Sequence, residues 1–390
     1  MSDWRLSESA PSGTEAIPAQ LLLVSCSARM LTQSAARMGA RAVTLDRYAD
    51  ADTRAAAEAT APIAGLGYGF DGEALLAAAN RLAPAAHYPL IYGSGLDTQP
   101  DLLERLAEGR TLLGNQPVTL RLCRSPDAFF STLDQLAIPY PERRQQWPAD
   151  PQNWLIKAGC SEGGKRVRFC AHAPAEADEY YQRRLMGEAL SVLFLADGHS
   201  AQIVGFNTQW TAPRSGQPFL FCGGINRAPL SSAQCEQLRV YVTRLVPQLM
   251  LKGLNSLDFM LDDETCRVLE LNCRPSATMA LYDADYPDGL LAAHIRACQG
   301  QLAASRPKQH PVRGLRVIFA PNDIKIPDAF AWPDWCADRP VSGSLIQRTD
   351  ALCTVTAEAA SPASVEQLIQ QRSNELIQRL GATAGGHYPN

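Results

Sequence analysis

Four polar side chains near the middle of the chain have the types and the spacing needed to bind a metal ion beside a positive charge. Asp258 lies in one run of alternating apolar and polar residues, and Glu270, Asn272 and Arg274 lie in the next. A period of two predicts a strand for each run, and the polar residues 262–265 between them predict an antiparallel hairpin. Carboxylate and amide oxygens are ligands that Mg²⁺ prefers, and Mg²⁺ usually shares them with substrate phosphates. The two acids and the amide are therefore candidate metal ligands.

The alternation also sorts the side chains between two faces. Glu270 and Asn272 stand two residues apart in a strand, so their side chains should lie on one side, about 7 Å apart. Asp258 joins them only if the connection has an odd count or contains a bulge, because an even connection would turn Asp258 away. A hairpin with one solvated polar face is the competing interpretation. The apolar side chains are expected on the opposite face: Leu257, Phe259, Leu261, Leu269 and Leu271.

A second segment supplies a fixed positive charge and a glycine-rich turn. Lys157 ends a predicted strand, and Gly163 with Gly164 precedes the next alternating run. Residues 159–165 nearly spell a P-loop, but Arg166 stands where a P-loop has Ser or Thr, and the alternation that follows predicts a strand instead of a helix. We therefore favour a strand, a glycine-rich flap and a second strand. Glycines let backbone N–H groups approach phosphate oxygens, and a lysine offers a point charge beside them.

The composition describes an ordinary globular protein. A length of 390 residues suggests two or three domains, with 46% hydrophobic and 19% charged residues. The net charge of −4 lacks the positive footprint that nucleic-acid binding needs. Eleven cysteines are scattered without a CxxC pair, which favours a reducing cytoplasm over a disulfide framework. Residues 1–20 lack the apolar core of a signal peptide or membrane span, so we expect a loose tail there and no membrane partner.

The first predicted domain begins with a strand, a helix and a second strand. An apolar strand covers 21–24, a helix follows over 30–38, and a second strand over 42–45 ends in Asp46. This order is typical of a Rossmann-like parallel sheet. The first turn, residues 25–29, contains no glycine, so the dinucleotide fingerprint is missing. We therefore predict a Rossmann-like topology without a dinucleotide.

Charged residues after the second strand leave two interpretations open. Asp46, Asp50, Asp52 and Arg54 follow the strand end, which is where open α/β sheets bind their ligands. These residues could line a substrate cleft, or they could belong to a solvated loop, and the sequence favours neither.

The rest of the chain supplies framework elements. Residues 180–188 predict a kinked strand, and residues 231–234 fit a capping box at the start of a helix. That helix carries an apolar stripe typical of core packing. A last lobe is predicted from strands over 315–320 and 351–357 and a closing helix over 364–380.

Combined in this order, these segments resemble the ATP-grasp superfamily, in particular its carboxylate–amine ligases and the carboligase branch related to biotin carboxylase. The resemblance covers about residues 111–300. It rests on a strand ending in Lys157, a flap with Gly163 and Gly164, a hinge from Gln182 to Gly187, and Asp258 upstream of the Glu-x-Asn-x-Arg-Pro stretch at 270–275. It implies an α/β (α+β) fold that begins with a tail over 1–20 and a Rossmann-like pre-ATP-grasp N-terminal domain over 21–110. An ATP-grasp domain with two lobes would follow over 111–310, with the flap and hinge lobe at 151–225. A small C-terminal lobe would cover 311–390.

The same resemblance implies that ATP lies between two lobes. Adenine would lie against the hinge backbone near Gln182 and Leu185. Lys157, Gly163 and Gly164 would hold the α- and β-phosphates.

The resemblance also implies two Mg²⁺ ions, with Mn²⁺ as a substitute, held by Asp258, Glu270 and Asn272. Arg274 would neutralise the γ-phosphate or an acyl-phosphate, and Lys157 would share this catalytic role. Transfers of this kind depend mainly on positioning and charge neutralisation, so the absence of a Ser/His/Asp or Cys/His set is expected.

Three features depart from what the resemblance would lead one to expect. The family's lysine on an early strand has no counterpart; Arg121 or Arg124 stands nearby, and the sequence does not choose between them. The acid that binds the ribose after the hinge corresponds best to Glu188, although the spacing differs by one residue. No biotin-carrier motif occurs, which counts against a fused carboxylase.

The function implied by the resemblance is that of an ATP-dependent ligase that joins a small-molecule carboxylate to an amine through an acyl-phosphate. Carboligases of this branch resemble ligases that add glutamate during synthesis of methanofuran- and pterin-type one-carbon cofactors, such as tyramine–glutamate ligase. Two alternatives stay open: a carboligase that uses bicarbonate, as biotin carboxylase does, and a non-catalytic ATP-binding sensor or scaffold. The complete set of acids, amide and arginine argues against the sensor. A homodimer is compatible with each of these functions.

Overall fold

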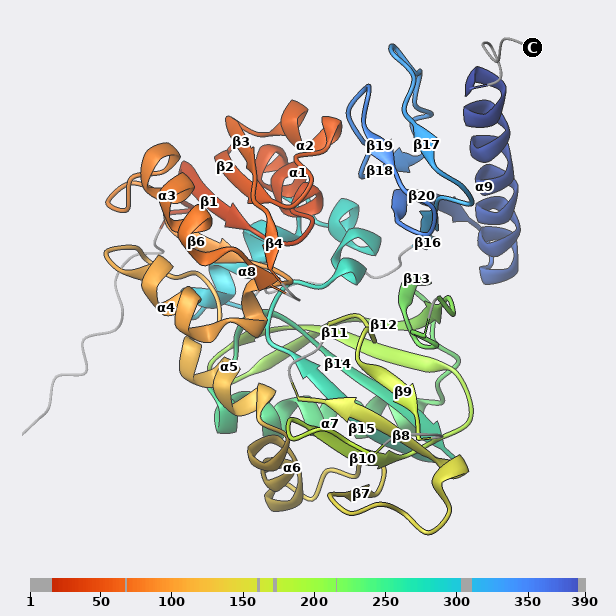
Figure 1. Cartoon of the computed structure of the whole chain (residues 1–390). Helices are drawn as coiled ribbons and strands as arrows, with labels where there is room; N and C mark the ends of the chain where they lie inside the picture. The colour runs from red at the N-terminus through yellow and green to blue at the C-terminus, as the bar shows by residue number, and fades with distance from the viewer. Residues whose placement is uncertain are drawn as a thin grey trace, which may run out of the picture.

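The computed structural model describes residues 16–66, 69–159, 162–170, 174–214, 216–302 and 311–384. Its helices and strands form an N-terminal domain, a central region with two sheets, and a C-terminal lobe (Figure 1). In this view the N-terminal domain and the C-terminal lobe lie at the top, above the central region, and hydrogen bonds from residues 338 and 339 to Asp52 connect them. The expected tail over 1–20 lies outside the described residues as far as residue 15.

The N-terminal domain contains a parallel sheet with the strand order β3-β2-β1-β6. The apolar run 21–24 is fully buried in an inner strand of this sheet, because helices cover parallel sheets on both faces. The prediction of a Rossmann-like parallel sheet is therefore confirmed. The elements are β1 (Gln20–Val24), α1 (Arg29–Arg37), β2 (Arg41–Asp46), α2 (Ala51–Ala56), β3 (Ala59–Pro62), β4 (Gly65–Leu66), β5 (Gly69–Phe70), α3 (Gly72–Leu82), β6 (Leu90–Tyr92), η1 (Leu96–Thr98) and α4 (Pro100–Ala107).

The central region begins with two helices and a small antiparallel sheet. The sheet has the order β7-β10-β8-β9 and carries both the predicted flap and the start of the predicted hinge. Its interior is a separate small cluster around Trp154, Ile156 and Tyr181. The elements are α5 (Pro117–Arg124), α6 (Pro126–Gln135), β7 (Arg143–Arg144), η2 (Pro151–Asn153), β8 (Trp154–Ala158), β9 (Val167–Phe169) and β10 (Glu179–Arg183).

A large antiparallel sheet forms the base of the molecule and continues into the C-terminal lobe. Its order is β15-β14-β11-β12-β13-β16-β20-β18, so three strands of the last lobe extend the sheet that carries the predicted hairpin. The strands are β11 (Ala189–Asp197), β12 (Ala201–Thr211), β13 (Phe221–Ile225), β14 (Lys252–Asp262), β15 (Thr265–Asn272), β16 (Val312–Phe319), β18 (Cys336–Ala337) and β20 (Ala351–Ala359).

Helices cover this sheet, and four short elements complete the fold. Helix α7 (Ser232–Leu249) starts with the predicted capping box and packs on β11, β12 and β15. Helix α8 (Leu290–Cys298) packs on β14, and α9 (Pro362–Ala384) packs on β16 and β20. The remaining elements are η3 (Ala277–Leu281), η4 (Asp283–Asp285), β17 (Ile324–Lys325) and β19 (Leu345–Ile346).

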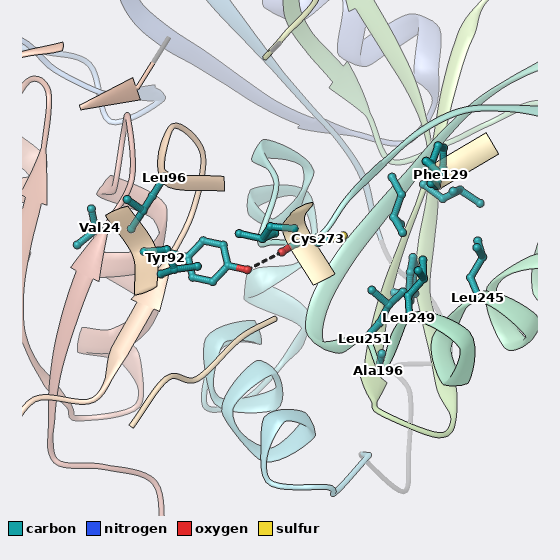
Figure 2. Packing of buried hydrophobic residues seen from close by; sticks show 14 of the residues in the cluster. Val24, Tyr92, Leu96, Phe129, Ala196, Leu245, Leu249, Leu251 and Cys273 are labelled. Atoms are coloured by element: carbon teal, nitrogen blue, oxygen red, sulfur yellow. Dashed lines mark hydrogen bonds between the residues drawn. The ribbon is translucent and has the colours of Figure 1, made fainter. Parts of the chain in front are cut away.

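One hydrophobic cluster joins the N-terminal domain to the central region. Figure 2 shows Tyr92 reaching from β6 toward Cys273, which stands between two of the predicted site residues. The Tyr92 hydroxyl lies 3.1 Å from the carbonyl oxygen of Cys273, and Asn115 Nδ2 donates to the same oxygen at 3.0 Å. The end of β15 is therefore fixed by residues from the N-terminal side of the chain.

A buried histidine makes a second connection at this junction. The backbone N–H of Leu254 donates to His294 Nδ1 at 2.8 Å, and His294 Nε2 lies 3.0 Å from the carbonyl oxygen of Leu113. Burial lowers the pKa of His294 to about 4, so the imidazole is neutral at physiological pH.

Candidate active site in the interlobe cleft

The hairpin of β14 and β15 brings Asp258 and Glu270 opposite each other. The register pairs Ser256 with Asn272 and Asp258 with Glu270, whereas the next pair toward the turn is Phe259 with Val268. One residue of β15 is therefore surplus, which is a β-bulge. The bulge that the sequence required for Asp258 to face Glu270 is present.

The bulge makes one expectation wrong. Leu269, predicted to face the core, is the surplus residue; it is only half-buried and lines the same cleft as Glu270. Val268 occupies the core position in its place and is fully buried. The extra residue interrupts the alternation, so two successive side chains turn to the cleft. The other predicted core residues, Leu257, Phe259, Leu261 and Leu271, do pack in or against the main cluster.

A single cleft of about 1650 Å³ lies between the N-terminal domain, the two sheets and the C-terminal lobe. The residues expected from the sequence to bind ATP and metal all line it: Lys157, Gly163, Gly164, Gln182, Leu185, Glu188, Asp258, Glu270, Asn272 and Arg274. These residues come from segments far apart in the sequence, so their convergence is the property expected of a ligand site.

Hydrogen bonds hold the two carboxylates at the floor of the cleft. Asn272 Nδ2 donates to Asp258 Oδ2 at 3.1 Å and approaches Glu270 Oε1 at 3.5 Å. Gln209 Nε2, on β12, donates to Asp258 Oδ1 at 3.1 Å. No motif in the sequence marks Gln209, which is one polar residue of an alternating strand, two residues after Asn207.

Among the described residues, no lysine or arginine forms an ion pair with either of the two facing carboxylates, Asp258 and Glu270. Burial and the negative charge of Glu270 raise the pKa of Asp258 well above its usual range. Burial by itself would also raise the pKa of Glu270, but the positive charges of Lys157 and Arg124 have the larger effect and lower that pKa. The site therefore favours one proton, or a metal cation, between the two groups.

Lys157 contributes a buried positive charge from β8. Its side chain is 8% exposed, and within the described residues no hydrogen bond or ion pair ends on its ammonium group. Burial opposes this charge, but Tyr180, Glu270 and Asp258 together outweigh burial and raise the pKa of Lys157. A charged ammonium group that lines the cleft without a fixed partner is suited to a phosphate oxygen.

Arg274 is held in place by a buried network. Arg274 Nη2 donates to Asn272 Oδ1 at 3.1 Å, and its Nε donates to Asp97 Oδ2 at 3.1 Å. Asp97 is fully buried and also pairs with Arg124. Burial works against the Asp97 carboxylate, but the two arginines outweigh it and lower the pKa of Asp97. Asp97 could not be predicted as a site residue, because no pattern in its neighbouring sequence indicates a partner 177 residues away.

The same network distinguishes the two arginines that the sequence left unresolved. Arg121 lies on the exposed side of α5, where it pairs with Asp101 and Glu104. Arg124 points inward to Asp97, and its charge acts on Glu270. Both stand on a helix instead of a strand, and neither is among the described residues that line the cleft.

The flap between β8 and β9 has backbone conformations that require glycine. Gly163 and Gly164 have φ angles of 58° and 75°. A Cβ atom on Gly164 would lie 2.0 Å from the carbonyl oxygen of Phe219, and the carbonyl of Gly163 accepts the N–H of Phe221 at 2.9 Å. Strand β9 follows, so the P-loop interpretation is excluded; Cys160 and Ser161, within that motif, lie outside the described residues.

The predicted hinge lies at the end of β10. Gln182 is buried and lines the cleft, and its Nε2 is a buried donor without a partner in the structure. Leu185 is half-buried and Glu188 is exposed, both on the cleft wall. The backbone N–H groups of Arg183 and Arg184 are already used, by the carbonyls of Glu142 and Asn153. An orphaned buried donor beside free cleft space is a place for a ligand acceptor atom.

The described residues contain no group of three or more His, Cys, Asp or Glu side chains arranged to hold a metal; the site above consists of two carboxylates and one amide. A helix with the length and apolarity needed to cross a membrane is likewise absent from this part of the chain.

Comparison with known proteins agrees with this geometry. Residues 128–278 match the protein family described as ATP-grasp domain. No curated protein matches the sequence. Among solved structures, the fold is similar to biotin carboxylase from Campylobacter jejuni in complex with β-γ-ATP, with a TM-score of 0.71, 13% identity, and coverage of 90% of this chain and 89% of that chain.

Two further structures show the same likeness. The biotin carboxylase domain dimer of Hydrogenobacter thermophilus 2-oxoglutarate carboxylase, with MgADP, ADP and bicarbonate, has a TM-score of 0.71 and 12% identity, over 90% of this chain and 89% of that one. N5-carboxyaminoimidazole ribonucleotide synthetase from Thermotoga maritima has a TM-score of 0.66 and 14% identity, over 92% and 98%. The chain therefore contains an ATP-grasp domain within a biotin-carboxylase-like fold, and the resemblance seen in the sequence is confirmed.

Proposed function

We propose that the protein is an ATP-dependent ligase that activates a carboxylate as an acyl-phosphate and transfers the acyl group to an amine. The observation that carries this proposal is the pairing of Asp258 with Glu270 across the bulged hairpin, in the same cleft as Lys157. The ATP-grasp match over residues 128–278 includes all three residues. A charged floor opposite a buried lysine suits a nucleotide triphosphate with its metal ions.

ATP is the nucleotide that fits this cleft. Adenine would lie at the hinge, where Gln182 Nε2 lacks a partner and Leu185 offers an apolar wall. Glu188 lies at the exposed end of the same wall, where a ribose hydroxyl would reach it. Lys157 and the backbone of Gly163 and Gly164 would contact the phosphates.

Two Mg²⁺ ions, or Mn²⁺ in their place, fit the residues present. Asp258 and Glu270 face each other while half-buried, and a divalent cation would relieve the repulsion that raises the pKa of Asp258. Asn272 now donates its amide hydrogens to both acids, so it would rotate its amide to present an oxygen to the metal. When bound, the metal ions would neutralise the charge that develops on the transferred phosphoryl group.

The side chains of this chain would then act on each step. A carboxylate oxygen of the first substrate attacks the γ-phosphorus, and ADP leaves; Lys157 neutralises charge on the phosphates. The amine nitrogen attacks the acyl carbon, phosphate leaves, and the amine gives up its proton. Arg274, already positioned by Asp97, would neutralise the acyl-phosphate.

For the substrates we propose glutamate as carboxylate and an amine from methanofuran- or pterin-type cofactor synthesis. This choice rests on the resemblance in the sequence. Bicarbonate is the second candidate, because a similar structure is a biotin carboxylase domain with bicarbonate. The substrates would be small molecules, and the enzyme a cytoplasmic homodimer, as the same structure is a domain dimer. Light scattering of the purified chain checks the oligomeric state.

The test is an assay of Mg²⁺-dependent ADP release by the full chain, with a panel of carboxylates and amines. The ligase predicts ADP release that needs both substrates and transfer of ¹⁸O from the labelled carboxylate to phosphate. Bicarbonate-stimulated release without an added carboxylate would favour the second candidate. ATP binding without ADP release for any carboxylate would contradict catalysis and favour a nucleotide sensor.

A pair of variants on the same hairpin makes the test specific. Glu270→Gln should lower ADP release at least about 100-fold, because a facing carboxylate is lost from the proposed metal site. Glu264→Gln changes an exposed carboxylate in the turn of the hairpin and should leave ADP release unchanged. Full activity of Glu270→Gln would show that the metal assignment is wrong.

A further inference from the structure

Asp50 is a buried carboxylate that lines the cleft without a partner. It precedes helix α2 at the N-cap position, where an aspartate normally accepts a hydrogen bond from the first turn. Asp50 makes no such bond, although it is only 7% exposed. Within the part of the chain that the structure describes, no hydrogen bond or ion pair ends on its carboxylate, and the side chain is on the cleft wall. Helix capping therefore does not explain this residue.

The three carboxylates near Asp50 are each committed to a structural contact. Asp46 accepts the N–H groups of Ala28 and Ala49, at 3.2 and 2.6 Å. These bonds fix the loop that leads from β2 to α2. Asp46 is therefore a structural residue, and the cleft interpretation does not hold for it.

Asp52 and Asp338 connect the N-terminal domain to the C-terminal lobe. Asp52 accepts the N–H groups of Asp338 and Arg339, at 2.9 and 3.0 Å. Asp338 accepts Ser27 Oγ and Arg29 Nε, both at 2.9 Å. Both carboxylates are thus satisfied by the contact between the two parts of the chain, and Asp50 alone is left with unused acceptor atoms.

The electrostatic surroundings of Asp50 are negative. The negative charges of Asp338, Asp46 and Asp52 raise the pKa of Asp50, and among its main neighbours only the positive charge of Arg29 lowers it. Arg29 is already bound by Asp338. Burial is the largest effect, and together these effects raise the pKa of Asp50 to about 8. Such an acid destabilises the empty protein when ionised, and a bound cation would remove that cost.

We propose that Asp50 binds a cationic nitrogen of the amine substrate, so that the N-terminal domain recognises an ammonium group. This inference rests on the proposed ligase function and specifies its second substrate as an amine that is positively charged before it reacts. Lys157 and Arg274 line the same cleft and are positively charged, so they suit phosphates and carboxylates. The cleft would therefore bind its two substrates at places of opposite charge. Binding is an ion pair; the bound ammonium group then loses a proton to water before its nitrogen attacks the acyl carbon, and Asp50 takes part in no bond-breaking step.

The test compares Asp50→Asn with Asp101→Asn in steady-state kinetics. Asp50→Asn should raise KM for the amine at least tenfold and leave KM for ATP and for the carboxylate unchanged. Asp101 is a surface carboxylate on α4 and should show no change. Hydroxylamine, which is largely uncharged at neutral pH, should trap the acyl-phosphate equally well in both variants, because it does not need Asp50. An unchanged KM for the amine in Asp50→Asn would overturn the proposal.

Two further readouts separate a binding role from damage to the fold. The thermal midpoint of Asp50→Asn should equal or exceed that of the natural chain at pH 8, since the variant removes an unfavourable buried charge, and a marked loss would overturn the proposal. Asp50→Glu should recover part of the amine affinity. If the natural chain releases no ADP with any substrate, the ligase proposal fails. Calorimetric titration of cationic amines onto the natural chain and onto Asp50→Asn then tests the role of Asp50 separately. Equal binding by the two proteins, or no binding by either, would overturn that role.

Discussion

Arg274 and Asp97 form a buried ion pair that joins the end of the site hairpin to the N-terminal domain, with Arg274 Nε 3.1 Å from Asp97 Oδ2. Arg124 pairs with the same carboxylate, so one acid supports two buried cations. Removing a partner from a buried pair is costly because the remaining charge stays buried. The position of Arg274 therefore depends on Asp97 in the short helix η1 of the N-terminal domain.

We predict that Asp97→Asn lowers the free energy of unfolding by about 3–5 kcal/mol, because both arginines lose their counter-charge. ADP release should fall as well, since Arg274 is no longer anchored. Urea denaturation measures the first effect. Asp101→Asn is the matched control, because Asp101 pairs with Arg121 on the surface and should cost less than about 1 kcal/mol. Equal effects of the two substitutions would contradict the buried network.

Two leucines of β15, Leu269 and Leu271, are both expected on the core face from the alternation of the sequence, but the bulge turns Leu269 to the cleft. Leu271 is 2% exposed in the core, and Leu271→Ala should lower the free energy of unfolding by about 2–5 kcal/mol. Leu269 lines the cleft, and Leu269→Ala should cost less than about 1 kcal/mol while it changes KM for ATP or the carboxylate. Chemical denaturation of the two variants checks this, and an equal loss of stability would show that β15 has no bulge.

The flap offers a pair of adjacent glycines for a test of close packing. Both have positive φ angles, so alanine at either position costs about 1 kcal/mol of backbone strain. Only at Gly164 would the new Cβ meet a backbone oxygen, that of Phe219 at 2.0 Å; at Gly163 the nearest atom is 3.8 Å away. Gly164→Ala should therefore displace the flap and raise KM for ATP at least tenfold, and Gly163→Ala should raise it much less. Equal values for both variants would argue against a flap held by Phe219.

His294 predicts a pH dependence of stability. Its pKa is about 4 in the folded chain and about 6.5 in an unfolded one, so the unfolded chain binds more protons between these values. Stability should therefore fall as the pH drops from 6.5 to 4, by up to about 3 kcal/mol from this group. His294→Asn should lose that part of the slope in urea denaturation curves. His199→Asn, at an exposed turn, should retain it.

The sequence by itself determined which side chains the candidate site offers and most of the framework that carries them. Alternation with a period of two predicted the hairpin of Asp258 and Glu270, and the apolar run 21–24 predicted a buried parallel strand, because these patterns follow from the geometry of a single chain segment. The order of Lys157, the glycine flap and the Glu-x-Asn-x-Arg stretch resembles the ATP-grasp superfamily, and the family match over residues 128–278 agrees with that resemblance.

The tertiary structure alone decided which residues meet across long distances in the sequence. The bulge at Leu269, the anchoring of Arg274 by Asp97 and the contact of Gln209 with Asp258 depend on how strands from different segments align, and no local pattern records that alignment. The same is true of Asp50, whose sequence neighbours Asp46 and Asp52 are equally acidic. Packing against the C-terminal lobe occupies Asp52 and leaves Asp50 on the cleft wall, and only a folded chain makes that difference.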